Sequence, residues 1–286
     1  MSSRSLLAIA LKFLLLFSLP SFAYSAETAS SADNLLKLHQ LRLAAQKSLG
    51  DFYMYNGMEG DQRYARMIDT SLQNGQALLG SLTQMPGDGS KALLAQLDQH
   101  WNSYQSELKV LADTLKTQGY TDLQPVADLA NHNQQLMALS AELYSKIQQE
   151  SGRTVSALTQ LSREQSLLMQ SIAVDYASRS ASVGGSFISS GGENSKSIDE
   201  LANDFVQVMD KLEQAPQNTA ETRQSLGAIK TKWRYIEKSL KNYNEKSVPF
   251  LVNKYSDRII EGLEALSGQS AARARAAEDR QGFCHQ

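Results

Sequence analysis

Apolar residues recur at steps of three and four positions along almost the whole chain. Leu35, Leu38 and Leu41 form one such stripe, and Leu201 and Phe205 begin another. This spacing places apolar side chains on one face of an α-helix. Strict two-residue alternation, which is typical of half-buried strands, is hard to find. The sequence therefore predicts an all-α protein, an elongated helical bundle of long antiparallel helices.

Prolines and glycines divide the periodic runs. Four prolines, Pro86, Pro125, Pro216 and Pro249, each fall between two runs, where proline ends one helix or begins the next. A Gly/Ser-rich stretch, residues 180–197, predicts the longest loop. The predicted helices cover residues 33–82 with a bend near Gly57, 90–117, 123–177, 198–213, 219–244 and 248–266.

The N-terminal segment has the layout of a secretory signal peptide. Basic Arg4 and Lys12 accompany an apolar run, and small residues follow it. Cleavage after Ala23 or Ser25 fits the small-x-small rule, so residues 1–25 are the predicted signal peptide. An uncleaved membrane anchor is the alternative, but the apolar run is short for a span of ~20 residues. We therefore expect a periplasmic protein that is soluble after cleavage.

Charge and cysteine content restrict the partners. The chain has 28 Lys+Arg and 30 Asp+Glu, mixed along its length. Because no basic stripe stands out, we expect no nucleic-acid partner. The single cysteine, Cys284, has no second cysteine for an internal disulfide. It is either a free thiol in a disordered C-terminal tail, residues 268–286, or part of an intermolecular disulfide.

One order of landmarks occurs twice. The stretch from Gln84 to Trp101 begins Gln-Met-Pro, and the stretch from Gln214 to Trp233 begins Gln-Ala-Pro. These are the only tryptophans in the chain, and a further proline follows each of them. The pattern predicts two tandem helical modules, residues 34–150 and 154–267, with both indoles buried at helix corners. Accidental spacing within one long helical protein is the alternative.

The repeated unit resembles a known sensor module. The segments LTQMPGDGSKALLAQLDQHW and LEQAPQNTAETRQSLGAIKTKW, with PVADLANHNQQLM as a closing helix, resemble the PilJ-type extracytoplasmic domain of type IV pilus chemotaxis transducers. That domain is related to the sensor domain of nitrate/nitrite sensor kinases. The resemblance implies two tandem PilJ-like modules that sense rather than catalyse.

The resemblance also implies an anion site. In the nitrate sensors, an arginine from the first helix of each partner holds the anion between two subunits. In LTQLSREQSLLMQS, Arg163 stands at the first arginine position of the family motif, and Gln165 replaces the second. In the other module Leu43 stands where an arginine is expected, and Arg42 is one residue away. Arg163 and Arg42 are therefore the candidate ligand-binding residues.

Two simpler interpretations of Arg163 do not involve an anion. It pairs with an acid close in sequence, Glu164 or Asp175, or it points into solvent.

Enzyme motifs are missing from the sequence, which has no Gly-rich phosphate loop, no Gly-x-Ser-x-Gly and no His-Glu-x-x-His. We therefore expect no enzyme activity and no cofactor.

Two further groups of residues are candidates for metal binding. The first comprises four scattered histidines, His39, His100, His132 and His285, which we interpret as surface or interfacial residues. The second is the Met- and Tyr-rich stretch DFYMYNGMEGDQRYARM, residues 51–67. Its methionines are soft metal ligands or, more simply, helix core. A ligand pocket where Gly57 and Gly60 loosen the helix is the intermediate interpretation.

These observations favour a non-enzymatic periplasmic sensor or adaptor protein that binds a small ligand, such as a small anion, between two modules. The chain contains no kinase or methyl-accepting region, so we expect a protein partner, a membrane receptor or kinase. A homodimer is a further candidate assembly. The alternative is a structural coiled-coil-like scaffold or interaction protein with no small ligand, and a metal-binding bundle is a third interpretation.

Overall fold

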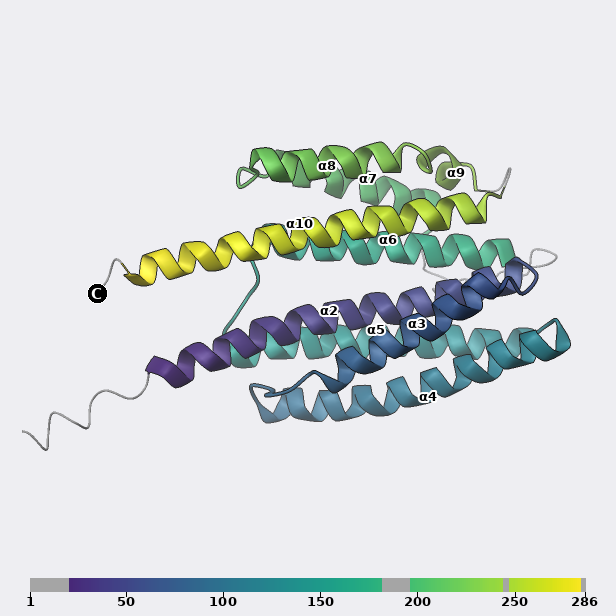
Figure 1. Ribbon diagram of the computed structural model, residues 1–286, viewed down its shortest axis with the longest axis horizontal. Helices are drawn as coiled ribbons and strands as arrows, with labels where there is room; N and C mark the ends of the chain where they lie inside the picture. Colours follow the sequence, from purple (N-terminus) through teal and green to yellow (C-terminus); the bar gives the residue numbers. More distant parts are fainter. Residues whose placement is uncertain (1–20, 182–195, 244–246, 284–286) are drawn as a thin grey trace, which may run out of the picture.

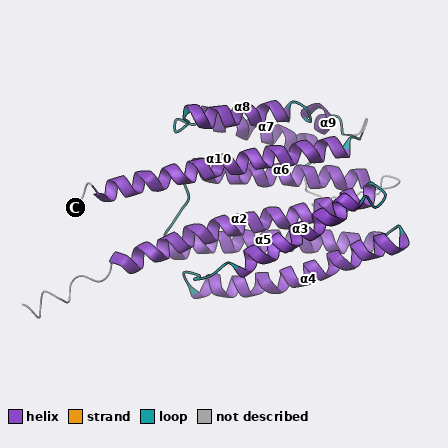
Figure 2. Ribbon diagram, in the orientation of Figure 1, coloured by secondary structure: helices purple, strands orange, loops and turns teal. Residues whose placement is uncertain are grey.

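The computed structural model describes residues 21–181, 196–243 and 247–283. Within them every regular element is a helix (Figure 2), which confirms the predicted all-α class. The helices are α2 (Ser21–Gly57), α3 (Gln62–Gly80), α4 (Asp88–Gln118), α5 (Leu123–Ser151), α6 (Ala157–Ala181), α7 (Ile198–Gln214), α8 (Ala220–Trp233), α9 (Glu237–Lys241) and α10 (Pro249–Phe283).

The helices form two groups that lie side by side (Figure 1). Helices α2–α5 make one bundle and α6–α10 make the other, and successive long helices run in opposite directions. Each bundle has its own cluster of buried apolar side chains. An amphipathic helix must bury its apolar stripe against neighbours, and an up-and-down bundle does this with short connections. We call the two groups the first and the second bundle.

The bundles meet mainly through α2 and α6. An ideal Cβ on Gly57 of α2 would lie 3.1 Å from the Cα of Ala181 on α6, and one on Gly50 would lie 3.3 Å from a methyl carbon of Val174. Small residues at these positions let the helix backbones approach closely. Helix α10 also contacts α6 and closes the second bundle.

The first predicted helix, residues 33–82, is wrong as a single element. The chain instead forms a hairpin of α2 and α3 (Figure 1), with a turn at residues 58–61. Glu59 and Gly60 have φ angles of 54° and 77°, a left-handed conformation that a right-handed helix cannot contain. Asp61 then caps α3, because its side chain accepts a hydrogen bond from the backbone N–H of Arg63 at 2.9 Å.

The predicted uninterrupted helix over residues 123–177 is also wrong. Helix α5 ends at Ser151, and Gly152 adopts a left-handed conformation with φ 65°. Glycine is the usual residue at such a helix end. The connection over residues 152–156 joins the two bundles, and α6 begins at Ala157.

Two boundaries differ in the second bundle. The predicted helix over 219–244 is divided into α8 and α9, because hydrogen bonds of residues 235 and 236 close three residues back rather than four. Ile236, in this turn, is fully buried. The tail predicted as disordered, residues 268–286, is helical up to Phe283 as the end of α10.

Both tryptophans are buried, as predicted. Each is the fourteenth residue of the third long helix of its bundle, α4 or α8. Trp101 covers Gly75 of α3, and its N–H donates to the Gln76 side chain at 3.0 Å. Trp233 instead stacks on Phe205 of α7 at 4.3 Å between ring centroids. Trp101 lies in the middle of α4, so its predicted place at a helix corner is wrong, whereas Trp233 is the last residue of α8. The duplication into modules 34–150 and 154–267 stays a prediction.

Several sequence predictions fall on residues outside this description. They are the predicted signal peptide up to residue 20, most of the Gly/Ser-rich loop, Cys284 and His285. Among the described residues, no helix has both the length and the apolar character that crossing a membrane requires.

Candidate ligand site between the two bundles

Charged and polar side chains concentrate where the two bundles meet. Helix α2 carries His39, Arg42, Lys47 and Asp51 along its length, and two of them bind acids of α10. Both sides of this part of α2 are covered by protein, since its leucines lie in the core of the first bundle. The contact between bundles is therefore mixed, because Val174 and Ala177 of α6 also belong to the apolar core of the first bundle.

Arg163 is buried in this contact. It lies on α6 with an exposed fraction of 5%. One terminal nitrogen, Nη1, donates to the hydroxyl of Tyr144 on α5 at 3.1 Å, and that hydroxyl donates to Gln160 at 3.0 Å. Among the described residues, no acceptor lies within hydrogen-bonding distance of the Arg163 Nε. The guanidinium is thus sequestered from water with one hydrogen-bond donor unused.

Arg42 contributes a second guanidinium from the first bundle. Its Nε is buried and, within the described part of the chain, has no hydrogen-bond acceptor. Burial lowers the pKa of Arg42, and the nearby Tyr144 and Glu164 oppose this effect. Tyr144 thus lies close to both arginines, since it also binds Arg163.

His39 and Glu264 connect the bundles at the same level. The His39 Nε2 lies 2.8 Å from the Glu264 Oε1, and the Ser166 hydroxyl donates to the same oxygen at 2.7 Å. Burial lowers the pKa of His39, and the positive charges of Arg163 and Arg42 lower it further. Although burial alone raises it, hydrogen bonds from His39 and Ser166 leave the pKa of Glu264 below its usual value. At neutral pH we assign a neutral His39 that donates to an ionised Glu264.

A second ionic group lies farther along α2. The Lys47 ammonium lies 2.9 Å from Asp257 of α10 and 3.4 Å from Asp51. Asp51 is 1% exposed, and its other oxygen accepts from Ser71 of α3 at 3.4 Å. Burial raises the pKa of Asp51 to about 7. This carboxyl therefore changes its protonation near neutral pH.

The sequence-predicted residues Arg163 and Arg42 both lie at this contact, but the simpler interpretations of Arg163 do not fit. Its side chain is buried, and its hydrogen-bond partner is Tyr144 rather than an acid. Glu164 is exposed and accepts from Gln160 instead.

Lys47, Asp51 and Glu264 were not predicted as site residues, and His39 was predicted only as a surface or interfacial residue. The sequence contains one local signal for these residues. Charged side chains interrupt the apolar pattern of α2, on the face that would be exposed to water if the first bundle stood alone. Their partners could not be found this way, because His39 and Glu264 are 225 positions apart.

The histidines are less scattered than the sequence indicates. His39 is 1% exposed, which makes its interpretation as a surface residue wrong and leaves it interfacial. His100 Nδ1 and His132 Nε2, from α4 and α5, lie 3.3 Å apart, and Glu107 lies 2.9 Å from His132. In the part of the chain that the structure describes, no group of three or more His, Cys, Asp or Glu side chains is arranged to hold a metal ion.

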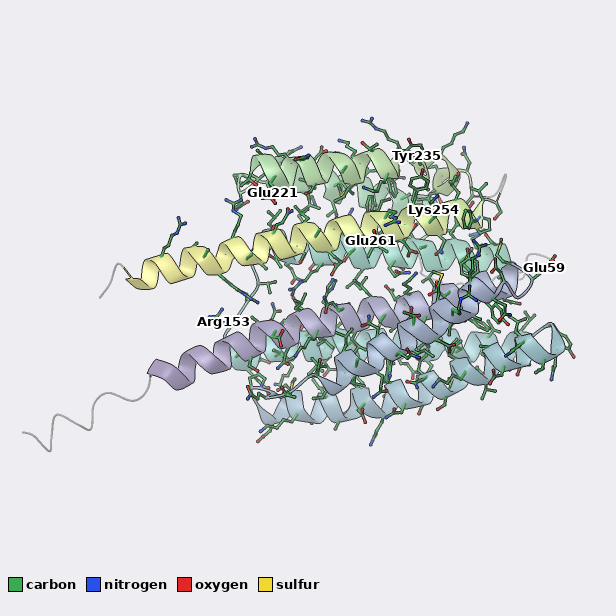
Figure 3. All side chains as sticks on the ribbon, in the orientation of Figure 1. Glu59, Arg153, Glu221, Tyr235, Lys254 and Glu261 are labelled. Carbon is green, nitrogen blue, oxygen red and sulfur yellow. The ribbon has the colours of Figure 1, made fainter. Side chains whose placement is uncertain are left out.

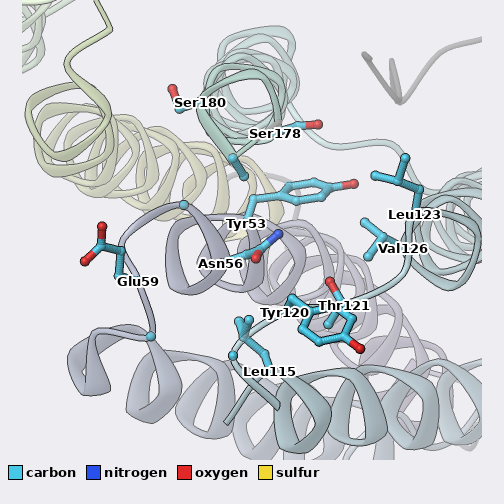
Figure 4. Close-up of a pocket in the computed structure, with 14 residues that line it drawn as sticks. Tyr53, Asn56, Glu59, Leu115, Tyr120, Thr121, Leu123, Val126, Ser178 and Ser180 are labelled. Atoms are coloured by element: carbon cyan, nitrogen blue, oxygen red, sulfur yellow. The ribbon is translucent and has the colours of Figure 1, made fainter. Parts of the chain in front are cut away.

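The Met- and Tyr-rich stretch divides between core and surface. Met54 is 1% exposed within the first bundle's core. Beside it, a pocket of about 520 Å³ opens where the α2–α3 turn, the α4–α5 turn and the end of α6 converge (Figure 4). Gly57 and Gly60 line it, as do Tyr53 and Tyr120. A pocket thus lies where these glycines interrupt the helix.

Comparisons with protein-family models, with curated protein sequences and with solved structures find no match for this chain.

Proposed function

We propose that this chain is a non-enzymatic helical sensor or adaptor that binds a small anion between its two bundles. One observation carries the proposal: each bundle contributes an arginine whose buried Nε–H has no acceptor among the described residues. A buried donor without a partner is costly, and the cost is greater for a charged group. A bound oxyanion would supply the missing acceptors.

The charges of the cluster support the same class of ligand. Arg42 and Arg163 both lie near His39, which is neutral, and Arg163 also lies near the half-buried carboxylate of Glu264. Two guanidinium charges therefore accompany one carboxylate in this cluster. The exposed Glu164 adds a solvated negative charge near Arg42. Guanidinium groups bind planar or tetrahedral oxyanions through paired N–H donors, which a lysine cannot reproduce. Nitrate, nitrite and small carboxylates are therefore the ligands to test.

The contact between bundles also suits signalling. A ligand that bridges α2 and α6 interacts differently with joined and separated bundles, and only such a difference can shift their equilibrium. In this proposal the protein is exported, and a membrane receptor or kinase reads the change. The resemblance of the repeated segments to PilJ-type modules supports this role.

Isothermal titration calorimetry tests the anion site. Wild-type protein should bind at least one of nitrate, nitrite or a small carboxylate. Arg163→Lys keeps the charge but loses the paired donors, so we expect its dissociation constant to rise by about 10- to 100-fold. Arg223→Lys, at an exposed position of α8, is the matched control and should bind like the wild type.

Two outcomes would count against the proposal. Equal affinity of the wild type and Arg163→Lys would remove Arg163 from the site. No binding of any of these anions by the folded wild type would favour the structural scaffold instead.

A further inference from the structure

A second feature of the same contact is a groove on the α10 side. It has a volume of about 490 Å³ and lies among α2, α3, α6 and α10. Its lining includes Gln40, Leu43, Lys47, Gln170, Ile260 and Glu264. Neither Arg42 nor Arg163 lines it, although Glu264, which belongs to the cluster around the proposed anion site, does.

The groove is acidic along α10. Asp257, Glu261 and Glu264 line it together with a single ammonium, Lys47, which gives the lining a net charge of −2 when all four are ionised. The three carboxylates follow one face of the helix, with rises of about 6 Å and 4.5 Å between successive residues. Glu261 projects from α10 and is labelled in Figure 3.

Each of these carboxylates keeps one oxygen free of protein partners in the described structure. Asp257 uses Oδ1 for Lys47, Glu261 uses Oε2 for Arg258, and Glu264 uses Oε1 for His39 and Ser166. The other oxygen of each can accept a hydrogen bond from a ligand. Three acceptors at successive levels suit a ligand with more than one ammonium donor.

The rest of the groove also suits such a ligand. Gln170 of α6 lines it and is 4% exposed. A glutamine amide that borders a groove can donate to a ligand and accept from it. Leu43, Ala44 and Ile260 also line the groove and offer apolar contact for methylene groups. The lining of the groove therefore combines hydrogen-bond acceptors with apolar side chains.

A metal ion fits this lining poorly. Ca²⁺ and Mg²⁺ need oxygen ligands at about 2.0–2.6 Å from one point, whereas these carboxylates are spread along two turns of α10. In the described residues no cluster of acids and histidines meets the requirement for a metal site. The hollow that continues from the groove shares Asp257 and Glu261 with it and adds the cations Arg63, Lys254 and Arg258. These cations limit how far a cationic ligand can extend.

We propose that this groove binds a short aliphatic diamine. Its ammonium groups would donate to the free oxygens of Glu261 and Glu264 and to the Gln170 amide oxygen, while its methylenes contact Leu43 and Ile260. The groove shares Glu264 with the cluster around the proposed anion site but contains neither of its arginines. The two proposals are therefore tested separately.

Calorimetry with butane-1,4-diamine tests the proposal, with n-butylamine as the ligand control. The monoamine loses one charge-assisted hydrogen bond, so we expect it to bind about tenfold more weakly or worse. Glu261→Gln should weaken diamine binding about two- to fivefold, because the residue is largely exposed. Gln170→Leu should weaken it about two- to tenfold through the lost hydrogen bond.

A gain of affinity separates this site from a merely structural role. Asn74 is exposed and lines the groove, so Asn74→Asp should tighten diamine binding about two- to fivefold. Glu237→Gln, on the distant α9, is the charge-matched control and should bind like the wild type, and Arg163→Lys should retain diamine affinity. Absence of diamine binding by the wild type, or equal affinities in wild type, Glu261→Gln and Asn74→Asp, would overturn the proposal.

Discussion

At the scale of single residues, the molecule buries charge where its two halves meet. Arg163, His39 and Asp51 are each exposed by 5% or less. Burial of a charged group is costly unless partners compensate it. His39 and Asp51 respond by shifts in pKa that favour their neutral forms, whereas an arginine cannot lose its proton in this way. This difference is why the arginines are the stronger candidates for ligand contact.

Asp51 should make stability depend on pH. Its folded-state pKa of about 7 lies above the ordinary value of 3.8, so between these values the folded state holds a proton that the unfolded state has released. Stability from this group therefore falls as pH rises through the window and is constant above pH 7. Asp51→Asn removes the titration. From pH 5 to 7, we expect the wild type to lose about 2 kcal/mol of unfolding free energy relative to the variant.

Urea denaturation at several pH values measures this difference. The comparison with the variant is needed because His39 acts in the opposite direction: its lowered pKa weakens the folded state as pH falls below about 6.5. Lys47, Ser71 and Asp257 surround Asp51 in both proteins, so their contributions largely cancel. A wild-type-to-variant difference that is constant from pH 5 to 8 would contradict the assignment.

At this scale the sequence allowed only part of the site to be predicted. Arg163 and Arg42 were found through a family resemblance, and both lie between the bundles. Tyr144 and Glu264 were not predicted, and the partners of His39 were not either, because a contact between residues on different helices leaves no periodic signal in either helix. Their association depends on how α2, α5, α6 and α10 pack.

At the scale of helices, periodicity predicted where helices lie better than where they end. The spacing of apolar residues identified helical segments throughout the described chain. The bend predicted near Gly57 is a full turn at Glu59 and Gly60, and the break at Gly152 was missed, although glycine at a helix end is a recognised signal. The break between α8 and α9 has no such residue, since residues 234–236 are Arg, Tyr and Ile. There, burial of Ile236 accompanies the change of direction.

Packing between α3 and α4 depends on one glycine. A Cβ on Gly75 would lie 2.1 Å from the Trp101 ring, so Gly75→Ala should displace the indole and lower the unfolding free energy by about 1–3 kcal/mol. Gly80→Ala, at the end of the same helix, meets nothing within 4 Å and should change stability by no more than about 1 kcal/mol. Chemical denaturation followed by far-UV circular dichroism compares the two. Equal effects would show that close α3–α4 packing at Gly75 is not required.

At the scale of the whole molecule, two apolar cores are joined through a contact that is partly ionic. His39 with Glu264 and Lys47 with Asp257 link α2 to α10, while Gly50 and Gly57 bring α2 close to α6. The all-α class followed from the sequence. How the bundles face each other did not, because it depends on which polar groups find partners across the contact. Because polar groups pair across this contact, a charged ligand bound there can change how the two bundles are arranged.

In the proposed site, arginines from the two bundles hold one anion together. The most direct test is a double-mutant cycle on anion affinity, with Arg42→Lys, Arg163→Lys and the pair measured by calorimetry. If both side chains contact the same ion, the second substitution should cost much less once the first is present, with a coupling energy of about 0.5–3 kcal/mol. Strictly additive losses, or a loss confined to one arginine, would contradict a shared site between the bundles.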